Sequence, residues 1–363
     1  MRTASHKARS TRGPVGSGMA FFVFSLMLFA PSSWGEKLAP EVEFCLSCHG
    51  QEALEIVLPS GEKRSLYVDA GRFERSVHGE KVGCTNCHSD INTFPHPPRT
   101  FKNLREFTVA YYESCKGCHF DNYTKTLDSV HYTILSRGDL KAPLCIDCHG
   151  AHYVARPRVP KSRISETCAR CHKAIYERYG QSVHGKALSQ DGNNDVPACT
   201  DCHRSHNIED PRTVSFHLKS PELCARCHSD EKLMKKYRLS TSVLGTYLSD
   251  FHGITASFYR KEQAAPAALT AVCTDCHGVH DILAVKDPRS SVMKANLLRV
   301  CRKCHPTATE NFPSAWLSHY EPSPEKAPLV YYVKLFYKIF IPFVIIGLVL
   351  QILLHVWRLV VNR

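Results

Sequence analysis

The cysteines of this 363-residue chain are arranged for one kind of chemistry. All 18 fall into nine Cys-x-x-Cys-His units, and none is left over. Residues i, i+3 and i+4 of a helical turn share one face, so two thiols can bond the two vinyl groups of a haem while the histidine binds its iron. The spacing therefore predicts nine covalently attached haems c, at Cys45/Cys48/His49, Cys84/Cys87/His88, Cys115/Cys118/His119, Cys145/Cys148/His149, Cys168/Cys171/His172, Cys199/Cys202/His203, Cys224/Cys227/His228, Cys273/Cys276/His277 and Cys301/Cys304/His305.

Two other uses of paired cysteines agree less well with the pattern. A disulfide framework would not place a histidine after every second cysteine. A zinc repeat of the Cys2His2 type needs a second histidine three residues after the first, and only three of the nine units have one. The nine motif histidines are therefore predicted to be the proximal ligands of haem iron.

Of the 21 histidines, twelve lie outside the motifs. His6 belongs to the N-terminal segment and His355 to the C-terminal apolar segment, which leaves ten. Nine of these occupy equivalent places after successive motifs, and His217 is surplus. Only Met234 and Met293 could replace them in residues 36–330, so His/His ligation and low reduction potentials are expected. The candidate distal ligands are His78, His96, His131, His152, His184, His206, His252, His280 and His319.

These histidines reveal an internal repeat of two alternating units. In one, a helical stretch separates the motif from Ser-Val-His, as at residues 129–131. In the other, a second histidine follows the proximal one by three residues, as at His152, His206 and His280. Such a histidine lies on the proximal side of its own porphyrin, so we expect it to bind a neighbouring haem packed close by. The alternative is a solvent-exposed or propionate-bonding histidine.

The motif density predicts the fold class. Residues 36–330 hold nine motifs, which leaves little chain for a conventional core. We expect a mainly α protein with much irregular loop, an elongated haem chain packed by short helices, and one C-terminal transmembrane helix. Helices are expected to begin at Ser165 and at Ser220, with Pro221 and Glu222 in the first turn, and residues 262–272 are expected to form an exposed loop.

Residues 1–35 are predicted to be a secretory signal peptide. A basic stretch ending at Arg12 precedes an apolar run from Met19 to Ala30 that is too short to span a bilayer. Small residues at 33 and 35 predict cleavage before Glu36, and an uncleaved anchor is the alternative. Either way the motifs at residues 36–330 are exported, as covalent haem attachment in the bacterial periplasm requires.

Residues 331–363 are predicted to be a C-terminal membrane anchor. From Ile339 to Val361 the chain is apolar except for Gln351, His355 and Arg358, and it is long enough to cross the hydrocarbon core. This predicts a bacterial inner-membrane protein with a single C-terminal span and its haem domain in the periplasm. His355 is a candidate ligand of a haem b shared with a partner, or a group that stabilises a quinone, and an interfacial position is the alternative.

The formal charge of +12 is not evidence for nucleic-acid binding. Eight of the bases lie in residues 1–35 and 334–363, and residues 36–333 hold 38 basic and 34 acidic residues. Each bis-histidine ferric haem contributes roughly one negative charge through its propionates, so nine haems bring this region to roughly −5.

The repeated units resemble the multihaem c-type cytochromes of the cytochrome c3-like class. The resemblance covers roughly residues 40–320 and rests on the Ser-Val-His-Gly and Cys-His-Gly-x-His elements. Nine haems followed by a membrane segment are also similar to the periplasmic head of inner-membrane quinol:cytochrome oxidoreductases of metal-reducing bacteria. That resemblance implies a membrane cytochrome b that oxidises menaquinol and passes electrons to the head. In this chain the cytochrome b is expected to be a separate subunit.

Electron transfer is the function that these features favour. Electrons would pass between a quinol-oxidising membrane partner and periplasmic cytochromes or reductases, with no catalytic residue in this chain. The alternative is a multihaem reductase of nitrite, hydroxylamine or a sulfur oxyanion, which needs one iron with an open site. Nine distal candidates for nine motifs argue against such a site. A structural or metal-storage repeat agrees poorly with the export signal and the haem motifs.

Overall fold

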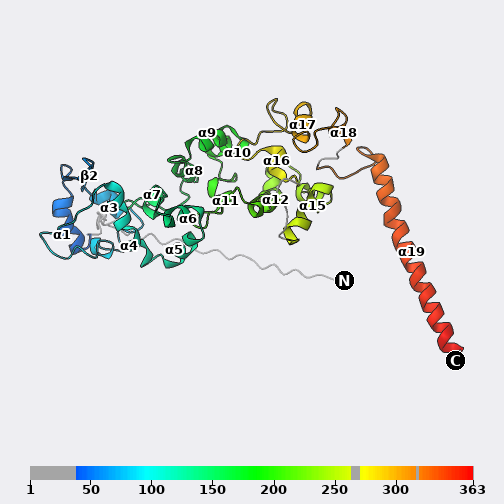
Figure 1. Cartoon of the computed structure of the whole chain (residues 1–363), viewed down its shortest axis with the longest axis horizontal. Helices are drawn as coiled ribbons and strands as arrows, with labels where there is room; N and C mark the ends of the chain where they lie inside the picture. The colour runs from blue at the N-terminus through cyan, green and yellow to red at the C-terminus, as the bar shows by residue number, and fades with distance from the viewer. Residues whose placement is uncertain (1–37, 263–269, 316–318, 363) are drawn as a thin grey trace, which may run out of the picture. The chain divides into compact units, whose positions relative to one another are not determined.

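The computed structural model describes residues 38–262, 270–315 and 319–362, and the prediction of a mainly helical fold is confirmed (Figure 1). The predicted signal peptide lies outside the described residues, as do residues 263–269 of the predicted loop. Strands β1 (Glu55–Val57) and β2 (Lys63–Ser65) form one antiparallel hairpin with Ile56 opposite Arg64. The helices before residue 190 are α1 (Pro40–His49), α2 (Ala70–Glu74), the 3-10 turn η1 (Cys84–Asn86), α3 (Leu104–Ala110), α4 (Tyr112–Lys116), α5 (Phe120–Leu127), α6 (Val130–Ser136), α7 (Cys145–His149), α8 (Ser162–Ala169), α9 (Lys173–Gln181) and α10 (Val183–Ser189).

The remaining helices follow the same pattern of short elements until the last one, which is long. They are α11 (Cys199–His203), α12 (Val214–His228), α13 (Glu231–Tyr237), α14 (Val243–Leu248), α15 (Phe251–Glu262), α16 (Cys273–His277), α17 (Lys294–Cys301), α18 (Phe312–Ala315) and α19 (Pro328–Val361). Irregular segments connect the short helices (Figure 1).

The haem motifs occupy single helical turns. In the third motif the backbone N–H of His119 donates to the carbonyl oxygen of Cys115 at 2.9 Å, which is the i to i+4 bond of an α-helix. Helices α7, α11 and α16 each begin at the first cysteine of a motif and end at its histidine. One turn therefore carries both cysteines and the histidine on one face.

Helices α6 and α10 begin at the valine of a Ser-Val-His sequence, and α15 begins at the phenylalanine of a Phe-His sequence. Each helix therefore carries a candidate distal histidine in its first turn. The Ser182 hydroxyl caps α10 by accepting the N–H of Gly185 at 3.0 Å. A Cβ atom at Gly185 would lie 1.9 Å from the carbonyl oxygen of Tyr179, and one at Gly253 would lie 2.0 Å from that of Tyr247. Glycine after the histidine therefore lets α10 and α15 pack tightly against the backbone that precedes them. At Gly79, which follows His78 outside any helix, the nearest carbonyl oxygen, that of Phe73, would lie 2.3 Å away.

Two helices begin earlier than predicted. Helix α12 begins at Val214, after Thr213 caps it by accepting the N–H of Phe216 at 3.2 Å, so Pro221 lies inside the helix. Helix α8 begins at Ser162 rather than at Ser165. Both predictions were wrong because local capping signals also occur inside helices, where tertiary packing decides the outcome. Ser165 and Ser220 are in fact buried, at 2% and 5% exposure.

The polypeptide builds only small apolar clusters of its own. Leu218, Tyr247 and Ala256 are buried together, with Leu244 and Tyr259 packed against them. This cluster joins α12, α14 and α15 beside the seventh and eighth motifs.

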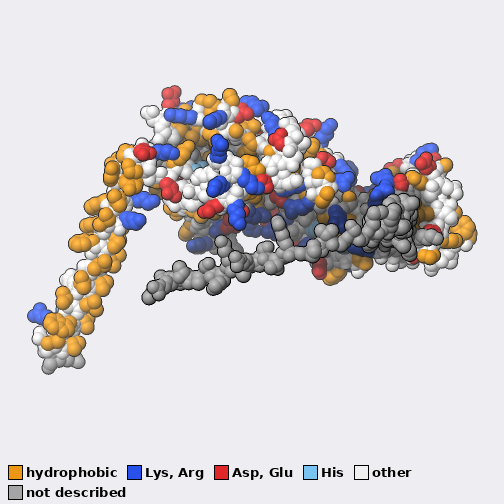
Figure 2. Space-filling model, turned by 180° about the vertical axis from the view of Figure 1, so that it is seen from behind, with side chains coloured by type: hydrophobic (Ala, Val, Ile, Leu, Met, Phe, Trp, Pro, Cys, Tyr) orange, Lys and Arg blue, Asp and Glu red, His pale blue; other side chains and the backbone are white. Residues whose placement is uncertain are grey.

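Helix α19 is different in kind from the short helices. It has 34 residues, begins at Pro328 and is long and apolar enough to cross a membrane. Figure 2 shows hydrophobic side chains along most of its length. None of its strongest apolar window is buried against the rest of the protein. Its first residue lies three positions before the predicted start of the anchor at residue 331.

Candidate haem sites

We number the Cys-x-x-Cys-His motifs 1 to 9 along the chain. The motif histidine of each lies against one of the nine candidate distal histidines, with ring centroids 6.0 to 6.3 Å apart. Every motif histidine has one such partner, and no candidate is used twice. The pairs are His49–His96, His88–His152, His119–His78, His149–His206, His172–His131, His203–His280, His228–His184, His277–His319 and His305–His252.

This spacing fits an iron atom between two imidazoles. Metal–nitrogen bonds of about 2 Å on both sides place two imidazole centres about 6 Å apart. The rings are also oriented for ligation at the far nitrogen. Nδ1 of His49 and Nδ1 of His96 each lie 2.9 Å from a backbone carbonyl oxygen, of Leu66 and Thr93 respectively, so Nε2 is the nitrogen left for the metal.

The pairing follows a rule. The histidine that follows an odd-numbered motif, such as His131 after motif 3, pairs with the motif two places later. The histidine that follows motif 4, 6 or 8, such as His206 after motif 6, pairs with the motif two places earlier. His96 closes the series between motifs 2 and 1, and His319 closes it between motifs 9 and 8. We call these nine pairs the pairing circuit, because they connect all nine motifs in one closed loop.

A sharp turn after the even-numbered motifs makes this pairing possible. Gly150, Arg204 and Gly278 directly follow the histidines of motifs 4, 6 and 8, and their φ angles are 75°, 64° and 83°. These positive angles redirect the chain at the end of the motif helix. The histidine three residues after the proximal one, such as His152, therefore lies against another motif's histidine instead of its own.

Backbone hydrogen bonds hold the distal histidines in neighbouring pairs. The N–H of Val77 donates to the carbonyl oxygen of Val154 at 2.9 Å, which brings the segment of His78 against that of His152. The same bond recurs from Val130 to Ile208 at 2.8 Å and from Val183 to Ile282 at 2.9 Å. The repeat seen in the sequence is therefore also a repeat of the structure, because equivalent backbone hydrogen bonds join distant residues at three places along the chain.

Consecutive motifs also touch one another. Four pairs of first cysteines lie close together, in motifs 1 and 2, 3 and 4, 5 and 6, and 7 and 8: Cys45 with Cys84, Cys115 with Cys145, Cys168 with Cys199, and Cys224 with Cys273. The second cysteines of motifs 2, 4, 6 and 8 approach the following motif, as Cys87 approaches Cys115. Each motif therefore has its sequence neighbours as spatial neighbours.

The two cysteines of a motif differ in exposure, a difference that the spacing did not predict. The first cysteine is half-buried in every motif, whereas the second is exposed in all motifs except 7 and 8. The exposed second cysteines are Cys48, Cys87, Cys118, Cys148, Cys171, Cys202 and Cys304.

The polypeptide therefore leaves the second thiol of seven motifs uncovered, including Cys48, Cys118 and Cys171 of motifs 1, 3 and 5. The physical reason is that a motif of one helical turn has too little chain around it to cover both of its thiols. Haem faces would have to supply the remaining buried surface in such a protein. Attachment at all 18 cysteines stays a prediction that rests on their spacing in the motifs.

Burial keeps many of the paired imidazoles neutral. Burial, with a smaller contribution from nearby histidines, lowers the pKa of His152 and of His184 to about 4. Burial is also the largest cause of the lowered pKa of His88, His131 and His203. The neutral imidazole is the form that binds a metal, so the electrostatics of the pairs suit ligation.

Sequence reasoning missed a polar residue inside the even-numbered motifs. The third position holds Asn86, Asp147, Asp201 or Asp275 in motifs 2, 4, 6 and 8, and none of these types occurs there in the odd-numbered motifs. The Asp201 carboxylate accepts the N–H of Ala198 at 2.8 Å and pairs with Lys161 at 3.0 Å. Burial raises the pKa of this carboxyl, but the two partners outweigh burial and lower it overall. The alternation of the motif sequences was the signal that could have revealed this feature.

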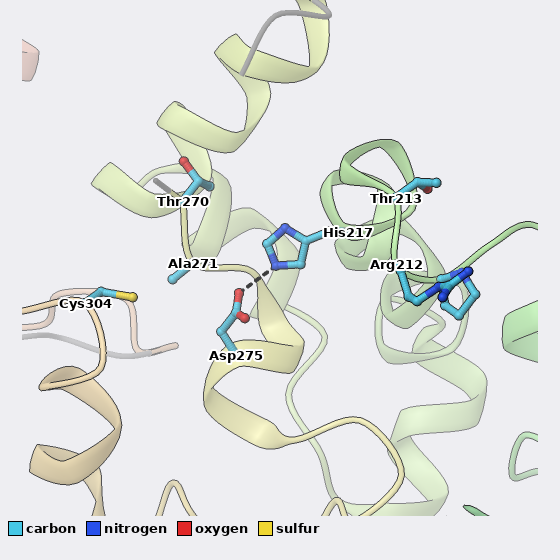
Figure 3. A pocket seen from close by; sticks show the side chains of 8 residues that line it. Arg212, Thr213, His217, Thr270, Ala271, Asp275 and Cys304 are labelled. Atoms are coloured by element: carbon cyan, nitrogen blue, oxygen red, sulfur yellow. Dashed lines mark hydrogen bonds and ion pairs between the residues drawn. The ribbon is translucent and has the colours of Figure 1, made fainter. Parts of the chain in front are cut away.

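The surplus His217 belongs to no pair. Its Nε2 lies 2.9 Å from Oδ2 of Asp275, inside motif 8 (Figure 3), and its ring is 22% exposed.

Residues 141–229 match the family model of cytochrome c3. This segment contains motifs 4 to 7 and the partners of motifs 4 and 7, His206 and His184, whereas the partners of motifs 5 and 6, His131 and His280, lie outside it. The match supports c-type haem binding and electron transfer by this part of the chain, as in a multihaem c-type cytochrome. No curated protein and no solved structure matches the chain.

Proposed function

We propose that the chain carries nine haems c and conducts electrons along them without catalysing a reaction of its own. The observation that carries this proposal is the pairing circuit, in which nine motif histidines have nine separate partners 6.0 to 6.3 Å away. Haem c supplies one-electron redox chemistry when bound. The cysteines would attach it, and the paired histidines would hold its iron. His/His ligation favours low reduction potentials.

The contacts between consecutive motifs support a path in chain order. The first cysteines of motifs 1 and 2 are in contact, and Cys87 of motif 2 approaches motif 3. Haems attached at these cysteines would lie close to one another, which is what electron transfer between them requires.

The pairing circuit disfavours the reductase alternative. A reductase of nitrite, hydroxylamine or a sulfur oxyanion needs an iron with one open position, whereas each motif histidine in the described residues has an imidazole opposite it. His217, which could have served as a catalytic acid, is bonded to Asp275.

We further propose that α19 anchors the haem domain on the periplasmic side of the bacterial inner membrane. Its length and mean hydropathy suit a span. Tyr331, Tyr332 and Tyr337 lie near its start and Trp357 near its end, where aromatic residues prefer the two membrane interfaces.

One face of α19 supports a membrane partner. Gly347, Gln351, His355 and Arg358 are the departures from apolar side chains within the span, and at 3.6 residues per turn they fall within about a quarter of the helix circumference. Polar residues in a span usually face protein rather than lipid. A parallel second copy would bring Arg358 beside Arg358 at the same depth, which like charges disfavour. The partner is therefore a different membrane protein, in this proposal a quinol-oxidising subunit of the cytochrome b type.

His355 is the candidate ligand through which that partner would share a haem b. Electrons from the quinol would then enter the haem chain and leave it for periplasmic cytochromes or reductases. The partner assignment stands apart from the haem assignment, because motifs 1 to 9 and α19 can be tested separately.

Electron paramagnetic resonance of the oxidised, detergent-solubilised full chain tests the central proposal. Nine haems per chain by iron and pyridine haemochrome analysis, all of them low-spin, is the expected result. A high-spin ferric signal equal to one haem per chain would contradict it and favour the reductase alternative. Fewer than nine haems would show that some motifs are not loaded.

A further inference from the structure

Helix α15 is longer than its two counterparts. Like α6 and α10, it carries a candidate distal histidine in its first turn, but it has 12 residues where each of the other two has 7. Because α6 and α10 position their histidines with the shorter length, pairing of His252 with His305 does not account for the additional turn of α15.

The outer face of α15 is apolar and open to solvent. Phe251 is 89% exposed, Ile254 55% and Phe258 58%. At 3.6 residues per turn these three side chains fall within about 60° of the helix circumference, and the exposed Lys261 continues their line at the C-terminal end. Single exposed apolar side chains are common on proteins, whereas a continuous apolar face usually contacts a partner or a membrane.

This face points away from the protein core and from the candidate haem ligand. Ala256 is buried and Tyr259 packs against it, in the cluster that joins α15 to α12 and α14 (Figure 1). His252 lies on the same side of the helix as these two residues, and the centre of that side is about 130° from the centre of the apolar face. A haem bound by His252 would therefore leave Ile254 and Phe258 exposed.

Contacts hold α14 and α15 close to the segment that leads into α19. The ring centroids of His252 and His305 are 6.3 Å apart, and the Thr246 hydroxyl of α14 lies 3.4 Å from Nδ1 of His319. His319 precedes Pro328, the first residue of α19, by nine positions. A fully extended chain of that length spans about 30 Å. The two helices therefore stay within this reach of the membrane that α19 is proposed to cross.

We propose that α15 lies in the membrane surface and holds the haem domain in one orientation on the bilayer. Phe251, Ile254 and Phe258 enter the boundary between headgroups and acyl chains, about 5–10 Å deep, and Lys261 lies among anionic headgroups. The inference rests on the proposed function, because it requires α19 to span the bilayer.

A bilayer suits this face better than a protein partner does. The face is one helix wide, whereas specific protein interfaces bury roughly 800 Å² on each side. A narrow apolar face that ends in a basic residue is typical of helices that lie in a membrane interface. The lipid surface is also the occupant that the connection to α19 brings within reach.

Contact of α15 with the bilayer would fix the haem sites nearest to the anchor. Helix α15 carries the partner of the motif 9 histidine, and α14 contacts His319, the partner of the motif 8 histidine. With α15 in the interface, motifs 8 and 9 keep a constant distance from the membrane. With α19 alone, the segment between His319 and Pro328 would let the haem domain change its orientation.

Photolabelling from the lipid tests the inference. The full-length protein is placed in nanodiscs of phosphatidylethanolamine and phosphatidylglycerol, with a lipid that carries a diazirine near the start of its acyl chain. Mass spectrometry of peptides then measures the label on α15, on α19 and on α5, whose Phe120 is 57% exposed and serves as the control. We expect label on α15 and α19 and background on α5. Ile254→Glu with Phe258→Glu should lower the label on α15 roughly tenfold and leave that on α19 unchanged, and Phe120→Glu should change neither.

Electron paramagnetic resonance of the oxidised protein in oriented multilayers tests the orientation. The haem signals of the native chain should depend on the angle between the membrane and the magnetic field. The double variant should lose most of this dependence, because its haem domain is held by α19 alone. If the double variant does not accumulate, Phe258→Glu by itself takes its place.

Three results would overturn the inference. One is an unlabelled α15 beside a labelled α19, which would leave the apolar face to a protein partner. Another is equal label on α15 and α5, which would show adsorption without preference for this face. The third is an angular dependence that is the same in the native chain and in the variant. Absence of label from α19 would contradict the proposed anchor instead, so the two failures are distinguishable.

Discussion

Distal histidines half-way along the haem region, called the middle of the circuit below, are held differently from His96, which closes the circuit between motifs 1 and 2 at the N-terminal end. His184, in the middle, lies in the first turn of α10, which a buried serine caps. The N–H of Val183 just before it bonds Ile282 at 2.9 Å. His96 lies in an irregular, exposed segment between helices, and its ring is oriented by one contact of 2.9 Å with the carbonyl of Thr93.

This difference follows from the position of each histidine in the circuit. A middle histidine connects motifs two places apart, and its segment must also join the segment of a second distal histidine. His96 connects motifs 1 and 2, which are already in contact through Cys45 and Cys84. Ligation in the middle should therefore hold the fold together, whereas ligation at the N-terminal end should mainly complete one iron site.

Removing a middle ligand should have the largest effect. His184→Ala removes the partner of the motif 7 histidine and opens a cavity beside α10. We therefore expect a loss of about 4 kcal/mol in unfolding free energy. One haem in nine should also become high-spin. Chemical unfolding followed by circular dichroism, with electron paramagnetic resonance of the oxidised protein, measures both quantities.

The matched change at the N-terminal end is His96→Ala. It should give the same high-spin signal of one haem in nine. The unfolding free energy should fall by less than about 1 kcal/mol, because His96 lies on an exposed segment. Added imidazole should restore the low-spin state at this exposed site. Equal losses of stability in the two variants would contradict the distinction between the middle and the end of the circuit.

The glycine after His184 tests whether helix position matters as much as the ligand itself. In Gly185→Ala the new Cβ would lie 1.9 Å from the carbonyl oxygen of Tyr179, so α10 must shift and displace His184. We expect the unfolding free energy to fall by about 2–3 kcal/mol and part of the low-spin signal to be lost. Gly180→Ala is the control, because nothing lies within 4 Å of its Cβ, and it should gain up to about 1 kcal/mol in α9. The two variants should differ in thermal unfolding, and similar values would contradict this account of α10.

Local chemistry was predictable from the sequence, and long-range pairing was not. The motifs and the helical fold could be predicted because Cys-x-x-Cys-His is a complete unit within one turn. Pairing such as that of His88 with His152 depends on the positive φ of Gly150 and on the bond between Val77 and Val154. Neither leaves a sequence signal beyond a glycine and two apolar residues. The assignment of each pair to an iron stays a prediction.

The same limit applies to the contact between His217 and Asp275 and to the helix boundaries. His217 and Asp275 are 58 residues apart, so no motif connects them, although the alternation of aspartate between even and odd motifs was visible. Ser220 has the sequence context of a helix start, yet Thr213 provides the cap and the chain continues through Pro221. In both cases the outcome depends on which distant segment packs against the residue.

The smallest effect is expected at the turn after motif 6, where Arg204 replaces the glycine of the two equivalent turns. Its φ of 64° and ψ of −171° are costly for a residue with a Cβ, and its ion pair with Glu209 is long at 3.8 Å and half-exposed. Arg204→Gly should therefore raise the unfolding free energy by about 1 kcal/mol and leave the pairing of His206 unchanged. Gly278→Ala is the converse, because its Cβ would meet Oδ1 of Asp281 at 2.4 Å, and it should destabilise the protein. A lower unfolding free energy in Arg204→Gly would contradict this account. It would mean that the contacts of the Arg204 guanidinium stabilise the protein by more than the strained backbone at this position costs.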